Sequence, residues 1–166
     1  MEAAPISTTA VQEQTLNSRV ALYISCRKLK DLDIMSKSDP QVEVYMKEKS
    51  QNKWILIGKT EKMVNNLNPD FTTFIECNYY FEKEQHLKFQ VWDVDAKERD
   101  FIGQVETTIG KIFGSQRQTF LADLTLENNQ TSRGKLIVRL DNIDTTNDQL
   151  HMKVSARLIP MGFLCC

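Results

Sequence analysis

The chain has 166 residues, of which 41% are hydrophobic and 26% charged, and its formal net charge is −1. This length supports one sizeable hydrophobic core and is short for two ordinary domains. The near-neutral charge provides no global positive field, which excludes nucleic acid as an expected partner.

The cysteines and the apolar pattern favour a cytoplasmic location. Neither a zinc site nor a disulfide framework is predicted, because the four cysteines form no Cys-x-x-Cys pair and have no histidine at ligand spacing. The first residues lack the pattern of a secretory signal, and no apolar run approaches the roughly 20 residues of a membrane-spanning helix. We therefore expect any membrane contact to be made from the surface.

In chain order, a flexible leader over residues 1–17 precedes a series of strand signals. The leader is rich in alanine, serine, threonine and glutamine and shows little apolar periodicity. Eight later segments alternate apolar and polar residues or are rich in β-forming side chains: 19–29, 41–46, 54–58, 71–81, 87–92, 101–107, 120–124 and 134–140. Residues 109–113 offer at most about one turn of helix. This pattern predicts an all-β fold, an eight-stranded antiparallel β-sandwich over residues 18–142.

The end of the chain carries a weak internal repeat. Residues 150–159 repeat the apolar positions of residues 20–29, with Ser155 matching Ser25. Repeats at a whole-domain period suggest tandem copies of one fold. Residues 143–166 are therefore interpreted either as a tail or as the first strand of a truncated second domain.

The strand predicted at residues 87–92 runs directly into an acidic stretch that contains Asp93, Asp95 and Asp100. Side chains two apart on a strand point to the same side, so Asp93 and Asp95 are expected to face the same way. Neighbouring carboxylates repel each other, and a bound cation is the usual reason that such a pair is tolerated. Oxygen ligands without histidine or cysteine favour calcium or magnesium over zinc. The alternative interpretation is a solvated acidic hairpin loop without metal.

A second acidic loop lies upstream, where Asp33 and Asp39 flank a polar segment that leads into another alternating strand. The two loops, in this order and with Asn68-Pro69 between them, resemble the calcium-binding rim of a C2 domain, and the resemblance covers residues 18–142. The Ser-Lys-Ser-Asp-Pro loop and the Asn-Tyr-Tyr-Phe-Glu segment are most similar to the first C2 domain of the copine family. Copines carry a second C2 domain and a von Willebrand A-type domain, so the resemblance implies a short or truncated member.

The resemblance implies a C2-type β-sandwich with a calcium site built from both acidic loops. The implied ligands are the carboxylates of Asp33, Asp39, Asp93, Asp95 and Asp100, with the carbonyl of Val94 as a backbone ligand. Crowded carboxylates need divalent ions near neutral pH, and the flexible oxygen shell of calcium suits such loops better than the strict octahedron of magnesium. Calcium is therefore the expected cofactor.

The resemblance further implies a calcium-dependent phospholipid-binding module that docks on anionic membrane surfaces through the two Asp-rich loops. Its expected location is the cytoplasm, with calcium-dependent recruitment to membranes. Ile34 and Met35 are expected to contact lipid, and Lys97 and Arg99 to contact anionic headgroups. The alternatives are that an apolar tip residue packs beneath its loop, and that the two basic residues offset the nearby aspartates.

Two other functions fit parts of the sequence. A C2 domain that binds no calcium would be a protein-interaction module, because metal binding depends on loop geometry. An Asp-X-Asp motif after an apolar strand also resembles the metal-binding motif of glycosyltransferases. Those enzymes alternate strands with helices, and this chain shows no helical pattern of normal length. We therefore expect a binding module and not an enzyme, with other proteins as alternative partners.

Overall fold

The computed structural model describes residues 17–33, 36–48, 53–96 and 98–143. The strands in these residues are β1 (Asn17–Arg27), β2 (Pro40–Glu48), β3 (Ile55–Lys59), β4 (Ile75–Tyr80), β5 (Gln85–Val94), β6 (Arg99–Thr108), β7 (Thr119–Asp123) and β8 (Lys135–Asn142). A short helix, α1 (Ile109–Phe113), and a 3₁₀ helix, η1 (Gln116–Gln118), join β6 to β7. None of the described helices has the length and apolar composition that crossing a membrane would require.

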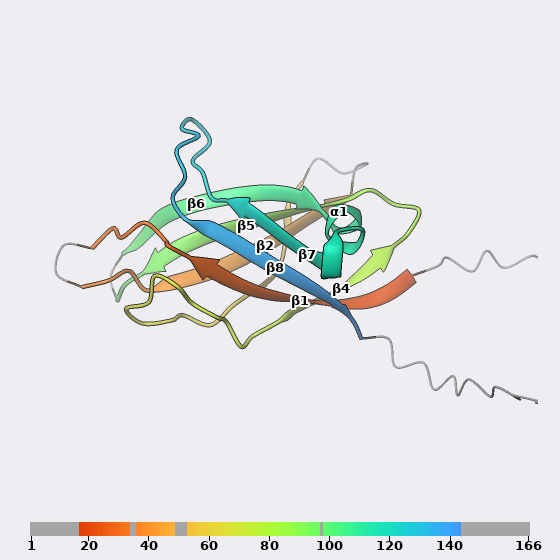
Figure 1. Ribbon diagram of the computed structural model, residues 1–166, viewed down its shortest axis with the longest axis horizontal. Coiled ribbons are helices and arrows are strands. Elements are labelled where there is room, and N and C mark those ends of the chain that lie inside the picture. Colours follow the sequence, from red (N-terminus) through yellow and green to blue (C-terminus); the bar gives the residue numbers. More distant parts are fainter. Residues whose placement is uncertain (1–16, 34–35, 49–52, 97, 144–166) are drawn as a thin grey trace, which may run out of the picture.

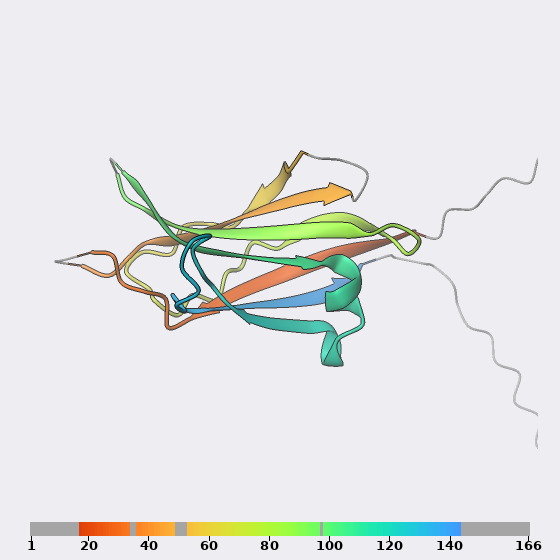
Figure 2. The same ribbon diagram turned by 90° about the horizontal axis from the view of Figure 1, so that it is seen from above.

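The strands form two four-stranded sheets, with the orders β4-β1-β8-β7 and β3-β2-β5-β6. Every neighbouring pair is antiparallel, and Figure 2 shows the sheets as two layers. The predicted eight-stranded antiparallel β-sandwich is therefore confirmed. The repeat predicted at residues 150–159 lies outside the described residues.

The strand pairing brings the two acidic loops to one end of the sandwich. Pro40 pairs with Asp93, so the start of β2 adjoins the end of β5. The described residues of the loop between β1 and β2 and of the turn between β5 and β6 consequently lie at the same end, on the left in Figure 1. The helix α1, the start of β1 and the end of β8 lie at the opposite end.

The core forms because alternate side chains of each strand point between the sheets. On β5, the buried positions are Gln85, Leu87, Phe89, Val91 and Asp93, and the residues between them are partly exposed. The buried row thus continues without a break from apolar residues into an aspartate. The same alternation that builds the core therefore carries one carboxylate inward at the loop end.

The segment between β7 and β8 closes one open edge between the sheets. Gln104 of β6 and Thr125 exchange backbone hydrogen bonds with N···O distances of 2.9 and 3.1 Å. Gly103 permits this approach, because a Cβ at that position would lie 3.2 Å from the Cβ of Leu124 and 3.3 Å from the carbonyl oxygen of Thr125. This contact joins β6 of one sheet to the segment that follows β7 of the other sheet.

The two strands beside the acidic turn are longer than the sequence pattern predicted. β5 continues to Val94 and β6 begins at Arg99. Asp93 and Asp100 are consequently paired strand residues across this ladder rather than loop residues. The difference arises because backbone pairing with β2 and β6 extends the strand past Trp92, where the predicted alternation ends.

Candidate metal centre

Three carboxylates meet at the loop end of the sandwich. Asp33 lies in the loop after β1, Asp93 at the end of β5 and Asp95 in the turn before β6. One oxygen of each lies within 4.8 Å of the others. This spacing allows one cation to contact all three, and an all-oxygen ligand set suits calcium or magnesium. We call Asp33, Asp93 and Asp95 the aspartate triad, and their role as ligands stays a prediction.

Asp93 is the buried member of the triad, with 1% of its surface exposed. Its Oδ1 accepts the backbone N–H of Asp39 at 2.6 Å. Its Oδ2 is buried and has no hydrogen-bond donor among the described residues. A buried carboxylate oxygen without a donor lowers stability, and a cation next to it would remove that penalty. The unsatisfied Oδ2 of Asp93 thus shows that these residues suit a bound metal ion.

The charge environment of Asp95 also favours a cation. Partial desolvation raises the pKa of Asp95, and the negative charges of Asp33, Asp93 and Asp39 raise it further. The nearby ammonium of Lys62 acts in the opposite direction. Because repulsion between like charges adds to the effect of desolvation on this pKa, added positive charge at this position would stabilise the ionised triad.

Side chains within the loop after β1 hold Asp33 in place. Ser38 is buried, and its Oγ accepts the backbone N–H of Leu32 at 3.0 Å. The Oδ1 of Asp31 accepts the backbone N–H of Ser38 at 3.2 Å. The Oγ of Ser36 donates to the Oδ2 of Asp33 at 2.7 Å. Asp31 therefore shapes the loop from its base, while Asp33 remains beside the other carboxylates.

Asp39 lies next to the triad but is bound to residues of another loop. Its Oδ2 accepts the ammonium of Lys62 at 2.8 Å, and its Oδ1 accepts the backbone N–H of Asn65 at 2.8 Å. Although burial raises the pKa of Asp39, these two hydrogen bonds and the charge of Lys62 lower it below the ordinary value. The oxygens of Asp39 thus already have partners beside the triad, and its role as a metal ligand stays a prediction.

Two other predicted ligands lie at the edge of the site. Asp100 pairs with Asp93 in the β5–β6 ladder, but it is exposed and does not belong to the group of converging carboxylates. Val94 lies between the aspartates of the turn, and its N–H donates to the carbonyl oxygen of Asp39 at 3.0 Å. The roles of the Asp100 carboxylate and the Val94 carbonyl as ligands remain predictions.

Of the predicted membrane contacts, one lies within the described residues and three lie outside them: Ile34, Met35 and Lys97. The Nη2 of Arg99 donates to the Oε1 of Glu43 at 2.9 Å. Its guanidinium also lies 4.7 Å from the ring centroid of Trp92. Arg99 therefore has partners on the sheet itself, and its contact with headgroups stays a prediction.

The loop between β3 and β4 contributes residues that the sequence pattern did not indicate. Lys62 and Asn65 both bind Asp39, and Val64 between them is 63% exposed. The signal that could have found them is strand register, because Lys59 at the end of β3 pairs with Glu43 near the start of β2. Because of this pairing, the loop that follows β3 lies beside the acidic loops.

The chain belongs to the C2 domain family, whose model matches residues 20–124. Among curated proteins, it is similar to copines of Dictyostelium discoideum. Copine-A is 40% identical over 129 residues, which make up 78% of this chain and 21% of that protein. Copine-E is 36% identical over 143 residues, 82% of this chain and 24% of that protein. The predicted resemblance to C2 domains and copines is confirmed, and the chain spans about a quarter of the length of these relatives.

Solved structures of C2 domains share the fold. A C2 domain of plant Extended Synaptotagmin 1 has a TM-score of 0.59 and 22% identity, covering 74% of this chain and 92% of that one. BON1-C2B has a TM-score of 0.58 and 18% identity, covering 81% and 98%. Calcium-bound Extended-Synaptotagmin 2, with a pair of C2 domains, has a TM-score of 0.53 and 21% identity, covering 75% and 45%. At these identities, the likenesses bear on the fold alone.

Proposed function

We propose that this C2 domain is a calcium-dependent phospholipid-binding module that docks on anionic membrane surfaces through the loops at its acidic end. The observation that carries the proposal is the aspartate triad with the unsatisfied, buried Oδ2 of Asp93. Family membership supports the assignment, and the all-β fold of the described residues does not suit the Asp-X-Asp glycosyltransferase alternative. The function requires no catalysis.

The residues proposed to hold calcium are Asp33, Asp93 and Asp95, with Asp39, Asp100 and the Val94 carbonyl as further ligands. When bound, calcium supplies positive charge that neutralises the carboxylates and that phosphate oxygens of a lipid can share. Asp93 provides an oxygen at the floor of the site, fixed by the N–H of Asp39. The loops thereby change from repelling an anionic surface to accepting it.

Val64 is proposed to contact lipid beside the triad. Its side chain is exposed, and its neighbours Lys62 and Asn65 are bound to Asp39 at the site. Burial of one aliphatic side chain in a membrane adds a modest, non-specific attraction to the electrostatic one. Ile34 and Met35 are proposed to act in the same way from the loop after β1.

The proposal concerns the domain that the relatives share and not their full length. We propose domain bounds of residues 18–142, with a leader at residues 1–17 and a tail at residues 143–166. A protein with this function would reside in the cytoplasm and move to membranes when calcium rises. Other proteins remain alternative partners, since Lys62 already offsets part of the negative charge without metal.

Vesicle co-sedimentation tests the proposal. The 166-residue chain is mixed with vesicles of phosphatidylcholine and phosphatidylserine, with calcium or with a chelator. We expect binding with calcium alone, and a requirement for about tenfold more calcium in Asp95→Asn, since one ligand charge is lost. Asp141→Asn is the matched control, because Asp141 is a partly exposed aspartate near the end of β8, away from the triad. Binding that ignores both calcium and Asp95→Asn would favour the protein-interaction alternative.

A further inference from the structure

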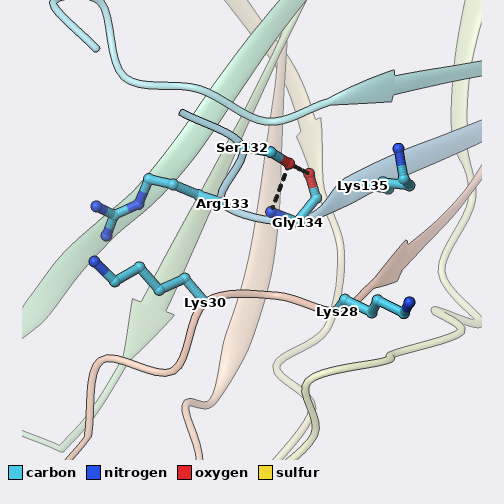
Figure 3. A pocket seen from close by; sticks show the side chains of 6 residues that line it. All are labelled: Lys28, Lys30, Ser132, Arg133, Gly134 and Lys135. Atoms are coloured by element: carbon cyan, nitrogen blue, oxygen red, sulfur yellow. Dashed lines mark hydrogen bonds between the residues drawn. The ribbon is translucent and has the colours of Figure 1, made fainter. Parts of the chain in front are cut away.

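A cavity of about 330 Å³ lies between the chain after β1 and the segment that leads into β8. It is lined by Lys28, Lys30, Ser132, Arg133, Gly134 and Lys135 (Figure 3). Four of these six residues are basic, and none belongs to the aspartate triad. The cavity is therefore positively charged, unlike the aspartate triad, and Lys28 and Lys30 lie in the same loop as Asp33.

The backbone fixes the two walls of this basic cavity against each other. The N–H of Lys30 donates to the carbonyl oxygen of Arg133 at 2.9 Å. Gly134 has a φ of 121°, and a Cβ at that position would lie 2.8 Å from the Cα of Leu29 and 2.9 Å from the carbonyl oxygen of Lys28. Only glycine adopts this conformation and leaves this space without strain. The basic side chains consequently project from a tightly joined pair of segments.

Most of the positive charge in the cavity lacks an internal counter-ion. Lys135 pairs with Asp123 at 3.1 Å. Lys28, Lys30 and Arg133 form no ion pair within the part of the chain that the structure describes. Figure 3 shows the side-chain ends of Lys30 and Arg133 on the same side of the cavity. Neighbouring like charges repel, so a bound anion would stabilise this arrangement.

Arg133 gives the second, independent indication of a ligand. Its Nε is buried and has no hydrogen-bond acceptor among the described residues. A buried donor without an acceptor lowers stability, and more so when the donor is charged. The planar guanidinium matches the oxygens of phosphate and carboxylate groups, with which it forms paired hydrogen bonds. The backbone N–H of Gly134 is a further donor, since its contact with the Oγ of Ser132 is a long 3.5 Å.

We propose that this basic cavity binds a phosphate group, as a phosphate monoester or a free phosphate anion. The neighbouring cationic side chains of Lys30 and Arg133, which have no counter-ion among the described residues, favour a multiply charged anion over a monovalent carboxylate. Arg133 would bind through its guanidinium and Lys30 through its ammonium group, whereas the Lys28 side chain ends on the other side of the cavity (Figure 3). The site is separate from the triad and needs no calcium. The phosphate could belong to a soluble compound or to a lipid headgroup, which share this chemistry.

Calorimetric titration with inorganic phosphate and pyrophosphate tests the site in metal-free buffer. We expect the 166-residue chain to bind one pyrophosphate, and Lys30→Gln to weaken that binding about tenfold, since it removes one charged contact. Lys30 is exposed, so its substitution preserves folding; Arg133→Gln, checked by thermal unfolding, should weaken binding likewise. Lys111→Gln is the control, because this exposed lysine lies on α1 at the opposite end of the domain.

A vesicle-binding experiment distinguishes the two sources of phosphate. Phosphatidylcholine vesicles with and without phosphatidic acid, whose headgroup is a phosphate monoester, are tested without calcium. Binding of vesicles alone, weakened by Lys30→Gln, would assign the phosphate to a lipid, and binding of pyrophosphate alone would assign it to a soluble compound. The proposal is overturned if neither probe binds, or if Lys111→Gln weakens binding as much as Lys30→Gln. Because calcium is absent throughout, these outcomes do not depend on the aspartate triad.

Discussion

The backbone N–H of Asp39 donates a 2.6 Å hydrogen bond to the Oδ1 of Asp93, which ties the loop after β1 directly to the end of β5. The N–H of Val94 makes a second connection to the carbonyl oxygen of Asp39 at 3.0 Å. Because backbone groups hold the loops together, the carboxylates of Asp33 and Asp95 stay close to Asp93 despite their repulsion. The fold therefore maintains a concentrated negative charge before any cation arrives.

Asp93→Asn should change the thermal stability of the domain, because it removes one of the mutually repelling charges. The asparagine keeps an acceptor for the N–H of Asp39 and replaces the unsatisfied charge with an amide. Because burial of an unpaired charge costs at least about 1 kcal/mol, we expect the metal-free variant to unfold about 3 °C above the wild type. Saturating calcium should raise the melting temperature of the wild type by mass action and that of the variant far less.

Thermal unfolding with and without calcium measures both effects of Asp93→Asn. Asp141→Asn serves as the control, because Asp141 is partly exposed and pairs with Arg139 at 3.0 Å on β8. The control should respond to calcium like the wild type. An equal calcium-induced shift in Asp93→Asn and the wild type would contradict the assignment of Asp93 as a ligand.

Lys62 is expected to compete with calcium. Its ammonium binds Asp39 at 2.8 Å, and that hydrogen bond, together with the charges of Asp39, Asp95 and Asp93, raises the pKa of Lys62. Lys62→Gln removes this positive charge, so the calcium dissociation constant should fall by about threefold to tenfold at low salt. Calorimetric titration measures the constant, with Lys59→Gln on the exposed β3 edge as the control. Unchanged or weaker binding in Lys62→Gln would show that Lys62 does not compete.

The sandwich and part of the site were predictable because both follow from strand periodicity. A side-chain period of two makes Val91, Asp93 and Asp95 share a side, whatever the rest of the chain does. The buried row of β5 follows this period as far as Asp93. Asp95 lies in the turn beyond β5, and its carboxylate still converges with that of Asp93. Local pattern did not give the boundary between the strands and the acidic turn, because the pairing of Asp93 with Asp100 extends β5 and β6 into that stretch.

The partners of Asp39 could not be predicted in this way. They depend on how the loop between β3 and β4 folds back, through hydrogen bonds from Thr60 N to Val42 O at 2.9 Å and from Met63 N to Pro40 O at 3.0 Å. Such contacts join residues far apart in sequence, so no local pattern encodes them. Five carboxylates were predicted to converge, whereas the group that lies within 4.8 Å in the described residues contains three. Asp39 binds Lys62 instead, and Asp100 is an exposed residue of the β5–β6 ladder.

Glu61 should make stability depend on pH in the acidic range. Its carboxylate accepts the N–H of Thr72 at 2.6 Å, the Oγ1 of Thr72 at 2.9 Å and the N–H of Thr73 at 3.1 Å. Although burial raises the pKa of Glu61, these hydrogen bonds hold it at about 2, below the ordinary value of 4.5. A depressed folded-state pKa stabilises the protein above the unfolded-state pKa, and this contribution is lost as the pH falls from 4.5 towards 2.

Urea unfolding of the wild type and Glu61→Gln at several pH values checks this expectation. At pH 7 we expect the free energy of unfolding to be about 1 kcal/mol lower in Glu61→Gln, because the hydrogen bonds lose their charge assistance. The difference should shrink as the wild-type carboxylate is protonated. A difference that is the same at pH 7 and pH 3 would mean that the charge of Glu61 contributes nothing.

Val64 offers a test of membrane docking that leaves the triad intact. Val64 is 63% exposed beside the site, and Leu121 on β7 is a control of similar exposure, at 59%, away from it. Val64→Ser should weaken the binding of phosphatidylserine vesicles at saturating calcium by about threefold to tenfold, because the apolar contact with lipid is lost. Calcium binding measured without vesicles should stay the same, since no triad oxygen changes. Equal losses in Val64→Ser and Leu121→Ser would show that the loop between β3 and β4 does not face the membrane.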